Sequence, residues 1–204
     1  MKKVVSKNLT IVLIIALIVA VVLTVTGCFV KSIDPPKDDI AEKNYPSEFF
    51  CEGTENRIDY QSGGNCAAYA TAYVLRELGE YAEGESVAKE VDRFFGFVPA
   101  KSIVNIFEKY GYFAKAYHGS TETLKQRLIN GVPVIVFVSI PSDTHYAVVV
   151  GYDEQYFYLA DSLAENRNTE EIRYNRKIAA YDFEKIWKTN TLLSDNIYIV
   201  VNIV

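Results

Sequence analysis

The segment 61–70 could supply a nucleophile and part of its surroundings. It reads Gln-Ser-Gly-Gly-Asn-Cys-Ala-Ala-Tyr-Ala, with Gln61 five residues before Cys66 and the pair Gly63-Gly64 between them. An apolar, alanine-rich run follows Cys66, which predicts a helix that begins at the cysteine. Because the positive end of a helix dipole favours a thiolate, this spacing can place a nucleophilic sulfur beside a side-chain amide donor.

A thiolate nucleophile needs a base and a group that orients the base. The chain has two histidines, and His145 opens an apolar stretch that ends in Gly-Tyr. The next apolar stretch, 156–160, is followed by Asp161. If the two stretches pair as a hairpin about the turn at 153–155, His145 and Asp161 meet at its open end. His118 has no comparable setting and is expected to be structural or at the surface.

These residues together predict a site for acyl transfer. Cys66 is the expected nucleophile, His145 the group that shares its proton, and Asp161 the group that fixes the imidazole. Gln61 is expected to donate to the oxyanion beside the backbone N–H of Cys66, and Gly63 and Gly64 allow the tight turn between them. Taken singly, each residue has an ordinary structural explanation, such as core packing for a helical cysteine, but their joint order favours a site.

The sequence offers no sign of a cofactor. It contains no cluster of His, Cys and carboxylates at metal-ligand spacing, no phosphate-binding loop and no nucleotide fingerprint after a strand. We therefore expect neither a metal nor an organic cofactor.

The elements that position these residues change in type along the chain. Periodicity predicts helices at 66–78, 86–95, 102–110 and 121–130, the last capped by Thr121, and a short strand at 113–117. Further strands are expected at 134–139, 145–152, 156–160, 171–178 and 196–204, with a loop at 162–170 and a short helix at 182–188. Helices followed by an antiparallel sheet predict an α+β fold.

Composition predicts a globular domain behind a targeting segment. The chain has 204 residues, half of them apolar, and a net charge of -5. No basic cluster occurs beyond the first seven residues, which argues against a nucleic-acid partner.

The first residues predict that the protein is located outside the cytoplasm. Three lysines precede an apolar run at 9–25, a pattern typical of a secretory signal and close to the length of a membrane span. Residues 25–28, Val-Thr-Gly-Cys, resemble a lipobox, which implies cleavage before Cys28 and lipidation of that cysteine. The alternative is an uncleaved single-span anchor. Both place the remaining chain at the extracytoplasmic face of a bacterial cell membrane.

The expected organisation is therefore a signal peptide or anchor at 1–27, a proline-containing spacer at 28–47 and one domain at 48–204. Cys51 and Cys66 could form a disulfide in an exported domain. Because that bond would consume the only cysteine with catalytic surroundings, two free thiols are favoured.

Several segments resemble the papain-like cysteine peptidases. They are the stretch around Gln61 and Cys66, the run from Leu124 through Asn-Gly-Val-Pro-Val-Ile-Val, and the blocks His145-Tyr-Ala-Val-Val-Val-Gly-Tyr-Asp and Leu-Ala-Asp161. Within that group the chain is most similar to the bacteriocin-processing (double-glycine leader) peptidases and their stand-alone relatives, over most of residues 58–188. The resemblance implies a papain-like fold, with the nucleophile helix packed on an antiparallel sheet that carries the histidine and aspartate.

The same resemblance implies the roles given above to the four site residues, and a peptide or protein substrate. Two features depart from it: Ala67 stands where many relatives have glycine, and the leader peptidases are usually fused to a transporter and act on the cytoplasmic side. We therefore expect a membrane-anchored extracytoplasmic cysteine peptidase that acts through an acyl-thioester. The alternatives are a cell-wall peptide amidase or transamidase on the same scaffold, and a catalytically silent binding lipoprotein.

Overall fold

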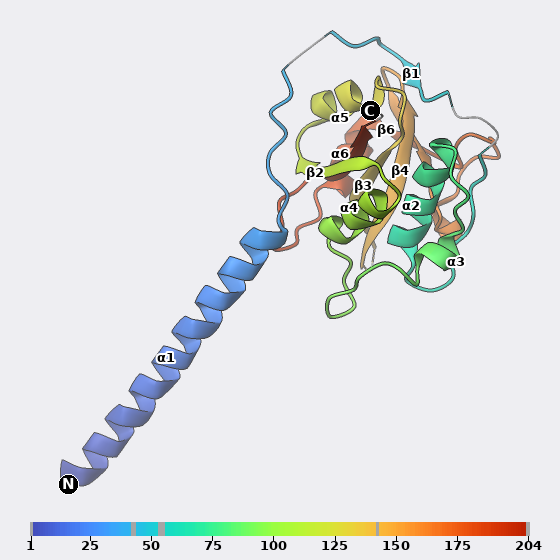
Figure 1. The fold of residues 1–204 in the computed structure, drawn as a ribbon. Helices are drawn as coiled ribbons and strands as arrows, with labels where there is room; N and C mark the ends of the chain where they lie inside the picture. The colour runs from blue at the N-terminus through green and yellow to red at the C-terminus, as the bar shows by residue number, and fades with distance from the viewer. Residues whose placement is uncertain (1, 42–43, 53–55, 142, 203–204) are drawn as a thin grey trace. The chain divides into compact units, whose positions relative to one another are not determined.

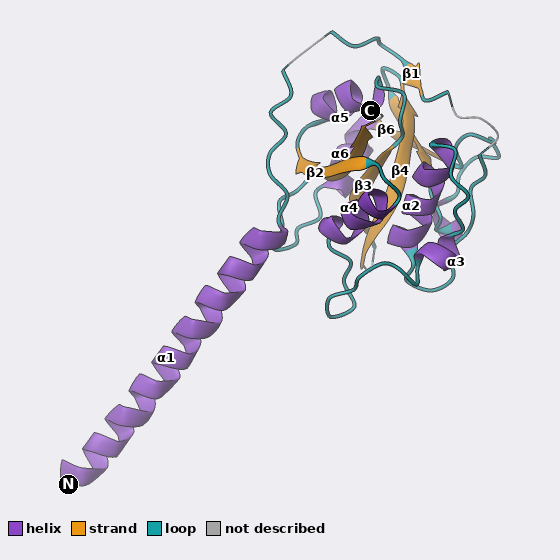
Figure 2. Ribbon diagram, viewed as in Figure 1, coloured by secondary structure: helices purple, strands orange, loops and turns teal. Residues whose placement is uncertain are grey.

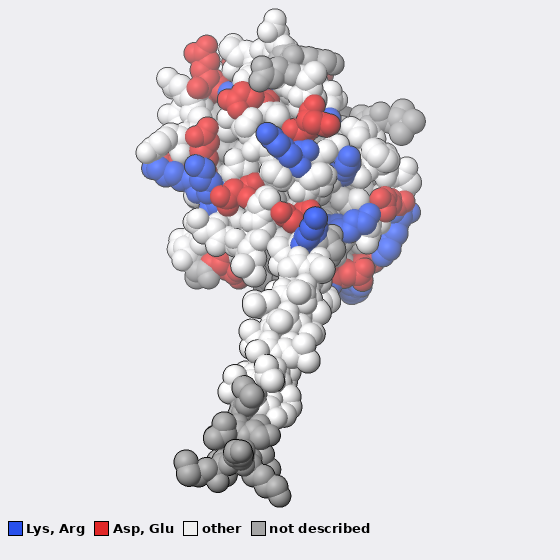
Figure 3. All heavy atoms as spheres, turned by 90° about the vertical axis from the view of Figure 1, so that its left-hand side faces the viewer, with Lys and Arg blue, Asp and Glu red and all other residues white. Residues whose placement is uncertain are grey.

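A computed structural model of the chain describes residues 2–41, 44–52, 56–141 and 143–202, which form two compact units, Met1–Asp34 and Pro35–Val204. The first unit contains helix α1 (Lys2–Ile33). Within it, Thr10–Lys31 is long and apolar enough to cross a membrane, with a mean hydropathy of 3.0, as an N-terminal signal sequence also would be. The described surface of this helix is almost free of charged side chains in Figure 3, whereas acidic and basic groups alternate over the second unit.

The second unit is built on a seven-stranded sheet (Figures 1 and 2). Its order is β2-β7-β3-β4-β5-β6, and β1 pairs with β4. The strands are β1 (Phe49–Phe50), β2 (Phe113–His118), β3 (Val134–Ile140), β4 (Asp143–Tyr152), β5 (Tyr156–Ala160), β6 (Arg176–Ala179) and β7 (Ile197–Asn202). All pairings between these described strands are antiparallel, so the predicted α+β fold is confirmed.

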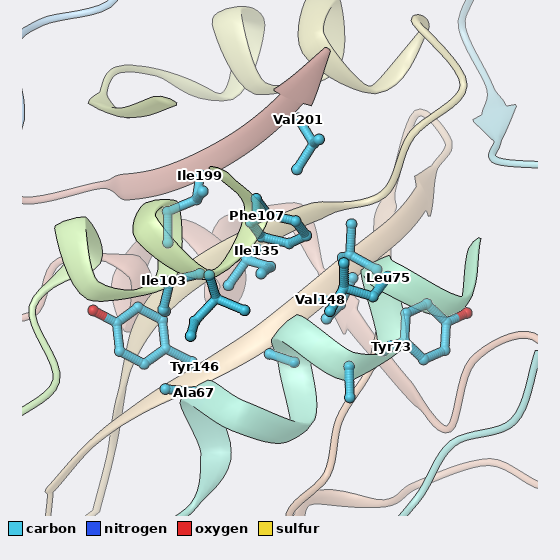
Figure 4. Close-up of a cluster of buried hydrophobic side chains, with 14 of the residues drawn as sticks. Ala67, Tyr73, Leu75, Ile103, Phe107, Ile135, Tyr146, Val148, Ile199 and Val201 are labelled. Carbon is cyan, nitrogen blue, oxygen red and sulfur yellow. The ribbon is translucent and has the colours of Figure 1, made fainter. Parts of the chain in front are cut away.

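Helices cover both faces of the sheet (Figures 1 and 2). They are α2 (Cys66–Glu77), α3 (Gly84–Val87), α4 (Ala100–Lys109), α5 (Thr121–Leu128) and α6 (Ala180–Trp187), with a 3₁₀ turn at Ala164–Asn166. One apolar cluster joins α2 and α4 to alternate strand residues such as Ile135 and Val148 (Figure 4). The other joins α5 and α6 to the residues between them, such as Val136 and Val149. This alternation is the two-residue period of strands buried on both faces.

Helix α2 lies close against β4 because its inner face is made of small side chains. Ala67, Ala68 and Ala70 are almost completely buried, in the same cluster as Tyr146 of β4 (Figure 4). An alanine-rich face allows close approach at little entropic cost, because alanine has no side-chain rotamers to lose. The consequence is that the first residue of α2 reaches the beginning of β4.

The helix predicted at 86–95 is wrong. Helix α3 is short, and hydrogen bonds of helical spacing end at Val91. Phe94 and Phe97 instead exchange two backbone hydrogen bonds of 2.7 and 2.9 Å about Phe95 and Gly96. These two central residues have φ of 49° and 83°, the left-handed pair that a type I′ hairpin turn requires. The apolar spacing that resembled a helix therefore belongs to a tight hairpin.

The other predicted elements are present with shifted ends. Ser120, not Thr121, caps α5 by accepting a hydrogen bond from the N–H of Thr123. The strand expected at 171–178 is shorter and later, as β6, and the two-residue β1 was not predicted. For the strand expected at 196–204, β7 covers most of the range, and 203–204 lie outside the described residues.

Part of the segment expected to be a spacer packs on the second unit. The backbone N–H of Asp38 donates to the carbonyl of His118 in β2, and the N–H of His118 donates to the carbonyl of Pro36. The Asp38 carboxylate is buried and accepts hydrogen bonds of 2.9 and 2.7 Å from Arg127, and another from the Tyr198 hydroxyl. Residues 35–38 therefore belong to the folded unit, whereas 42–43 lie outside the described residues.

Candidate active site

Cys66 is the first residue of helix α2, and its thiol is partly buried. The backbone N–H groups of Ala67 and Tyr146 and the imidazole of His145 all hydrogen-bond the sulfur. Burial alone would raise the pKa of the Cys66 thiol, but these hydrogen bonds and the charge of His145 outweigh it and leave the pKa lowered. The surroundings of Cys66 therefore make its thiol easier to ionise than a free cysteine.

His145 lies in β4 and meets Asp161 as the hairpin register predicts. Strands β4 and β5 pair from Tyr152 opposite Phe157 to Val148 opposite Ala160, with a bulge near Val150. Asp161 follows β5 directly, and its Oδ1 lies 2.7 Å from Nε2 of His145. Since Nε2 is used in this way, Nδ1 is the nitrogen left for the Cys66 thiol.

The electrostatics of His145 complement those of the thiol. Burial would lower the pKa of the imidazole, but hydrogen bonds and charge from Asp161 and Cys66 outweigh it and raise the pKa to about 9. An imidazolium beside a thiolate, held by a carboxylate, is the resting arrangement that nucleophilic attack by sulfur requires.

Gln61 lies beside this group and is held at both ends of its amide. Its Oε1 accepts a 2.8 Å hydrogen bond from the hydroxyl of Ser162, and its Nε2 donates one of 2.8 Å to the carbonyl of Gly63. Its backbone N–H donates to the carbonyl of Ser162 at 2.9 Å. The amide has two N–H groups, so the second is available to a ligand in the cleft.

Hydrogen bonds to Glu85 and from Arg93 hold the turn between Gln61 and Cys66. Ser62 donates its hydroxyl to Glu85, which also accepts 2.8 Å from the hydroxyl of Tyr69. Arg93 donates to the carbonyl of Gly64 at 3.3 Å and to the side chain of Asn65 at 2.5 Å. These contacts fix the residue just before the nucleophile.

Asp161 has a set of partners that the sequence did not predict. Its side chain is fully buried and accepts hydrogen bonds from the N–H of Leu163, from Asn166 and from Arg176, at 2.9, 2.9 and 2.8 Å. Asn175 bonds both the N–H and the C=O of Asp161, each at 2.8 Å. The polar pair Asn175-Arg176, at the start of β6, was the available signal, but only the pairing of β6 with β5 gives it meaning.

Burial alone would raise the pKa of the Asp161 carboxyl. The hydrogen bond and charge of His145, the Leu163 N–H and the charge of Arg176 outweigh that effect, so the pKa lies below its usual value and the group is ionised.

A cleft of about 510 Å³ gives access to the sulfur and the imidazole. Gln61, Cys66 and His145 line it, and so do apolar side chains of Phe97, Val98, Phe137 and Ile140. Arg93 and Asp143 contribute its charges. Most of the side chains that line the cleft are apolar. Among the described residues, no group of three His, Cys, Asp or Glu side chains can hold a metal.

The remaining candidates lie elsewhere. Cys51 is buried with the α5 and α6 cluster, whereas Cys66 packs with the other cluster, so no disulfide joins them and the prediction of free thiols is confirmed. Burial, with the charge of Glu77, raises the pKa of Cys51 to about 12, which makes it inert. His118 lies in β2, at the far end of the sheet order from β5. Cys28 is exposed on α1.

The sequence matches the Peptidase_C39 like family over residues 19–192. None of the curated proteins matches it.

Several solved structures are similar in fold. A putative C39-like peptidase from Bacillus anthracis aligns with a TM-score of 0.57 and 16% identity, over 76% of this chain and 98% of that one. The peptidase domain of Streptococcus ComA, a bi-functional ABC transporter, aligns with a TM-score of 0.56 and 15% identity, over 72% and 98%. Xylellain, a cysteine protease from Xylella fastidiosa, aligns with a TM-score of 0.52 and 12% identity, over 83% and 92%. At these identities the likeness is one of fold.

Proposed function

This chain belongs to the Peptidase_C39 like family, and we propose that it is a membrane-anchored, extracytoplasmic cysteine peptidase with Cys66, His145 and Asp161 as its triad. The observation that carries the proposal is the continuous chain of contacts from the thiol through the imidazole to a fully buried carboxylate. Its substrate is a peptide or protein that lies in the cleft. No bound metal or cofactor takes part in the proposed chemistry.

In the first step the Cys66 thiolate attacks the scissile carbonyl carbon, and the C=O electron pair moves onto oxygen. The N–H of Cys66 and the second N–H of Gln61 donate to that oxyanion. His145 then gives its Nδ1 proton to the departing nitrogen as the C–N bond breaks. The amine leaves, and the acyl group remains on sulfur as a thioester.

In the second step water hydrolyses the thioester. His145, now neutral, takes a proton from the water as its oxygen attacks the acyl carbon, and the same donors hold the second oxyanion. The C–S bond breaks, the acid is released, and the sulfur leaves as a thiolate beside the protonated imidazole. Asp161 keeps the ring in the orientation that both steps use.

Helix α1 supports the proposed location. The first seven residues carry three lysines, and positive charge at the start of a hydrophobic segment favours a cytoplasmic N-terminus. The folded unit then lies on the opposite side. We propose that Val25-Thr26-Gly27-Cys28 is a lipobox and that Cys28, after cleavage, carries the lipid; an uncleaved span is the alternative.

The lipidated form of the protein and the form with an uncleaved span differ in mass. The intact mass of the purified protein is expected to equal that of a chain beginning at Cys28 plus acyl groups. A Cys28→Ser variant is expected to keep residues 1–27. Equal, unprocessed masses for both proteins would favour the uncleaved span.

Alkylation tests the triad directly. Full-length protein in detergent is treated with iodoacetamide across pH, and the labelled cysteine is mapped by peptide mass spectrometry. Cys66 is expected to react selectively below about pH 7, and this selectivity is expected to vanish in His145→Ala. Labelling of Cys66 that instead follows an ordinary thiol, with a pKa of about 8.5, would favour a protein that binds peptides without cleaving them.

A further inference from the structure

The carboxylate of Asp161 serves two cations, one on each oxygen. Oδ1 accepts from Nε2 of His145 at 2.7 Å, and Oδ2 accepts from Nη1 of Arg176 at 2.8 Å. The Asp161 side chain is 0% exposed and that of Arg176 is 14% exposed, so solvent screens this pair little. A triad needs only the first of these contacts to orient its imidazole.

The position of Arg176 is built into the sheet. Arg176 stands opposite Leu159 in the β5–β6 pairing, two residues before Asp161. The preceding residue, Asn175, hydrogen-bonds the N–H and the C=O of Asp161. These bonds hold the start of β6 against the start of the loop that follows β5. The guanidinium therefore reaches Oδ2 from a residue that is held in the sheet.

We propose that Arg176 is a positioning residue of the candidate active site, which shares the buried Asp161 carboxylate with His145 so that His145 can lose its proton while the acyl-enzyme is hydrolysed at neutral pH. This inference rests on the proposed peptidase function. It concerns the second step, in which the imidazole must be neutral to accept a proton from water.

The physical reason is charge balance in a buried site. Without Arg176, a neutral His145 would leave the Asp161 carboxylate as an uncompensated buried charge, which is costly. The imidazole would then hold its proton to neutralise the carboxylate. With Arg176 in place, the carboxylate is already paired, and the imidazole can be neutral at low cost.

The two chemical steps place opposite demands on His145. In the resting enzyme the Cys66 thiolate helps to hold the imidazolium, since both Asp161 and Cys66 raise the pKa of His145. In the acyl-enzyme the sulfur is bonded to carbon and its charge is gone. The positive charge of Arg176 then offsets the negative charge of Asp161, which favours the protonated imidazole. His145 can therefore act as a base.

The charged and titratable groups around His145 come from five parts of the chain: Asp161 after β5, Arg176 in β6, Cys66 in α2, Asp143 in β4, and Arg93 between α3 and α4. Only Arg176 among these is a cation that contacts the carboxylate partner of the imidazole. A variant of Arg176 therefore changes the balance on Asp161 without removing a group that contacts the reacting atoms.

The test compares the full-length protein in detergent with Arg176→Gln, Arg176→Lys and Lys177→Gln. Lys177 is the matched control because it is the next residue of β6, is exposed, and lies over Tyr156 instead of Asp161. The probe is p-nitrophenyl acetate, which transfers its acetyl group to Cys66. The rate at which acetyl-Cys66 disappears is followed by mass spectrometry as a function of pH.

Removal of the cation is expected to raise the pKa that governs deacylation by about one pH unit in Arg176→Gln. At pH values below this pKa, the rate of deacylation is then expected to be about tenfold lower than in the wild type. Arg176→Lys, which retains the charge, is expected to lie closer to the wild type, and Lys177→Gln is expected to match it. If the pH profile of deacylation in Arg176→Gln coincides with that of the wild type, the inference is overturned and the peptidase proposal still stands.

Two controls separate the possible failures. A wild-type protein that forms no acetyl-Cys66 contradicts the proposed function itself, and the inference falls with it. If Arg176→Gln does not fold, as judged by circular dichroism, the comparison uses Asp161→Asn and Asp161→Asn/Arg176→Gln, in which no carboxylate is left buried without its partner.

That second comparison is read by NMR of labelled histidine. The two histidines give separate imidazole signals, and the His118 signal serves as the internal reference. Because the amide that replaces the carboxylate carries no charge to share, loss of Arg176 is expected to leave the pKa of His145 nearly unchanged in the Asp161→Asn background. A rise of about one pH unit would show that Arg176 acts on the imidazole directly and would overturn the inference.

Discussion

The hydroxyl of Ser162 donates a 2.8 Å hydrogen bond to Oε1 of Gln61, although the two residues are 101 positions apart in the chain. Ser162 follows Asp161, and Gln61 precedes the nucleophile helix. This contact therefore ties the proposed oxyanion donor on the helical side to the carboxylate on the sheet side. It orients the Gln61 amide with its N–H groups away from Ser162.

Ser162→Ala is expected to loosen the Gln61 amide without removing it. A single neutral hydrogen bond contributes about 1 kcal/mol, so kcat for a p-nitrophenyl ester is expected to fall about fivefold. The rate of Cys66 alkylation by iodoacetamide is expected to stay the same, because that reaction forms no oxyanion. Ser139→Ala is the control, at a half-buried serine of β3 whose hydroxyl donates to the carbonyl of Lys188. Equal loss of both reactions in Ser162→Ala would indicate damage to the thiolate instead.

Gln61→Ala removes the proposed oxyanion donor itself. Loss of one such donor typically lowers kcat by about 10²–10³-fold. We expect a loss of this size in ester and peptide hydrolysis, again with alkylation of Cys66 preserved. Gln155→Ala, in the exposed turn after β4, supplies a matched glutamine control. A Gln61→Ala enzyme with wild-type kcat would remove Gln61 from the mechanism.

The pKa of His145, raised to about 9, sets an upper pH limit for peptide cleavage. A raised pKa means that the imidazolium is present below about pH 9 and is lost as the pH rises through that value. An amide needs this proton for its departing nitrogen, whereas a nitrophenyl ester does not. We expect acylation by a peptide p-nitroanilide to decline above about pH 9 and acylation by the matching p-nitrophenyl ester to continue. Parallel declines for both would contradict the assignment of His145 as the acid.

The buried Asp38 carboxylate is expected to stabilise the folded unit in a pH-dependent way. Burial would raise its pKa, but hydrogen bonds from Arg127 and Tyr198 outweigh burial and lower it. A lowered pKa means that the stabilisation is complete above the unfolded value of about 4 and is lost as the pH falls through the folded value.

Asp38→Asn breaks this buried ion pair and is expected to lower the free energy of unfolding by about 3 kcal/mol at neutral pH. Urea unfolding of the full-length protein in detergent, followed by the fluorescence of Trp187, measures it; Trp187 is the single tryptophan, is buried and packs against Tyr198. The difference from the wild type is expected to shrink below about pH 4. Asp39→Asn, at the exposed neighbouring residue, is the control and is expected to unfold as the wild type does.

Local spacing explains what could be predicted from sequence. The meeting of His145 and Asp161 follows from a hairpin with a short turn, where register is set by a few residues. Arg176 reaches Asp161 across the loop that follows β5, and no local pattern fixes how β6 pairs after such a loop. The fold class could be predicted because it depends on the order of helices and strands along the chain. Errors in where an element begins or ends do not change that order.

The two clear misreadings also have local causes. Residues 86–95 have helical spacing, but Phe95 and Gly96 adopt left-handed φ values that only a turn uses, and a non-glycine residue gives little sign of this. The polar composition before the domain suggested a spacer at 28–47, yet the Asp38 carboxylate fixes part of it through partners far away in the chain.

The Asp38 contacts also determine how the protein bears mechanical load. If the N-terminal helix is held in a membrane, tension along the chain reaches Pro36 and Asp38 before it reaches any strand of the sheet. There it meets backbone bonds to β2 and a buried ion pair to α5, which pass the load to the β2 edge of the sheet. The cleft is lined by residues of β3 and β4, so the load enters the fold at a different strand from those of the cleft.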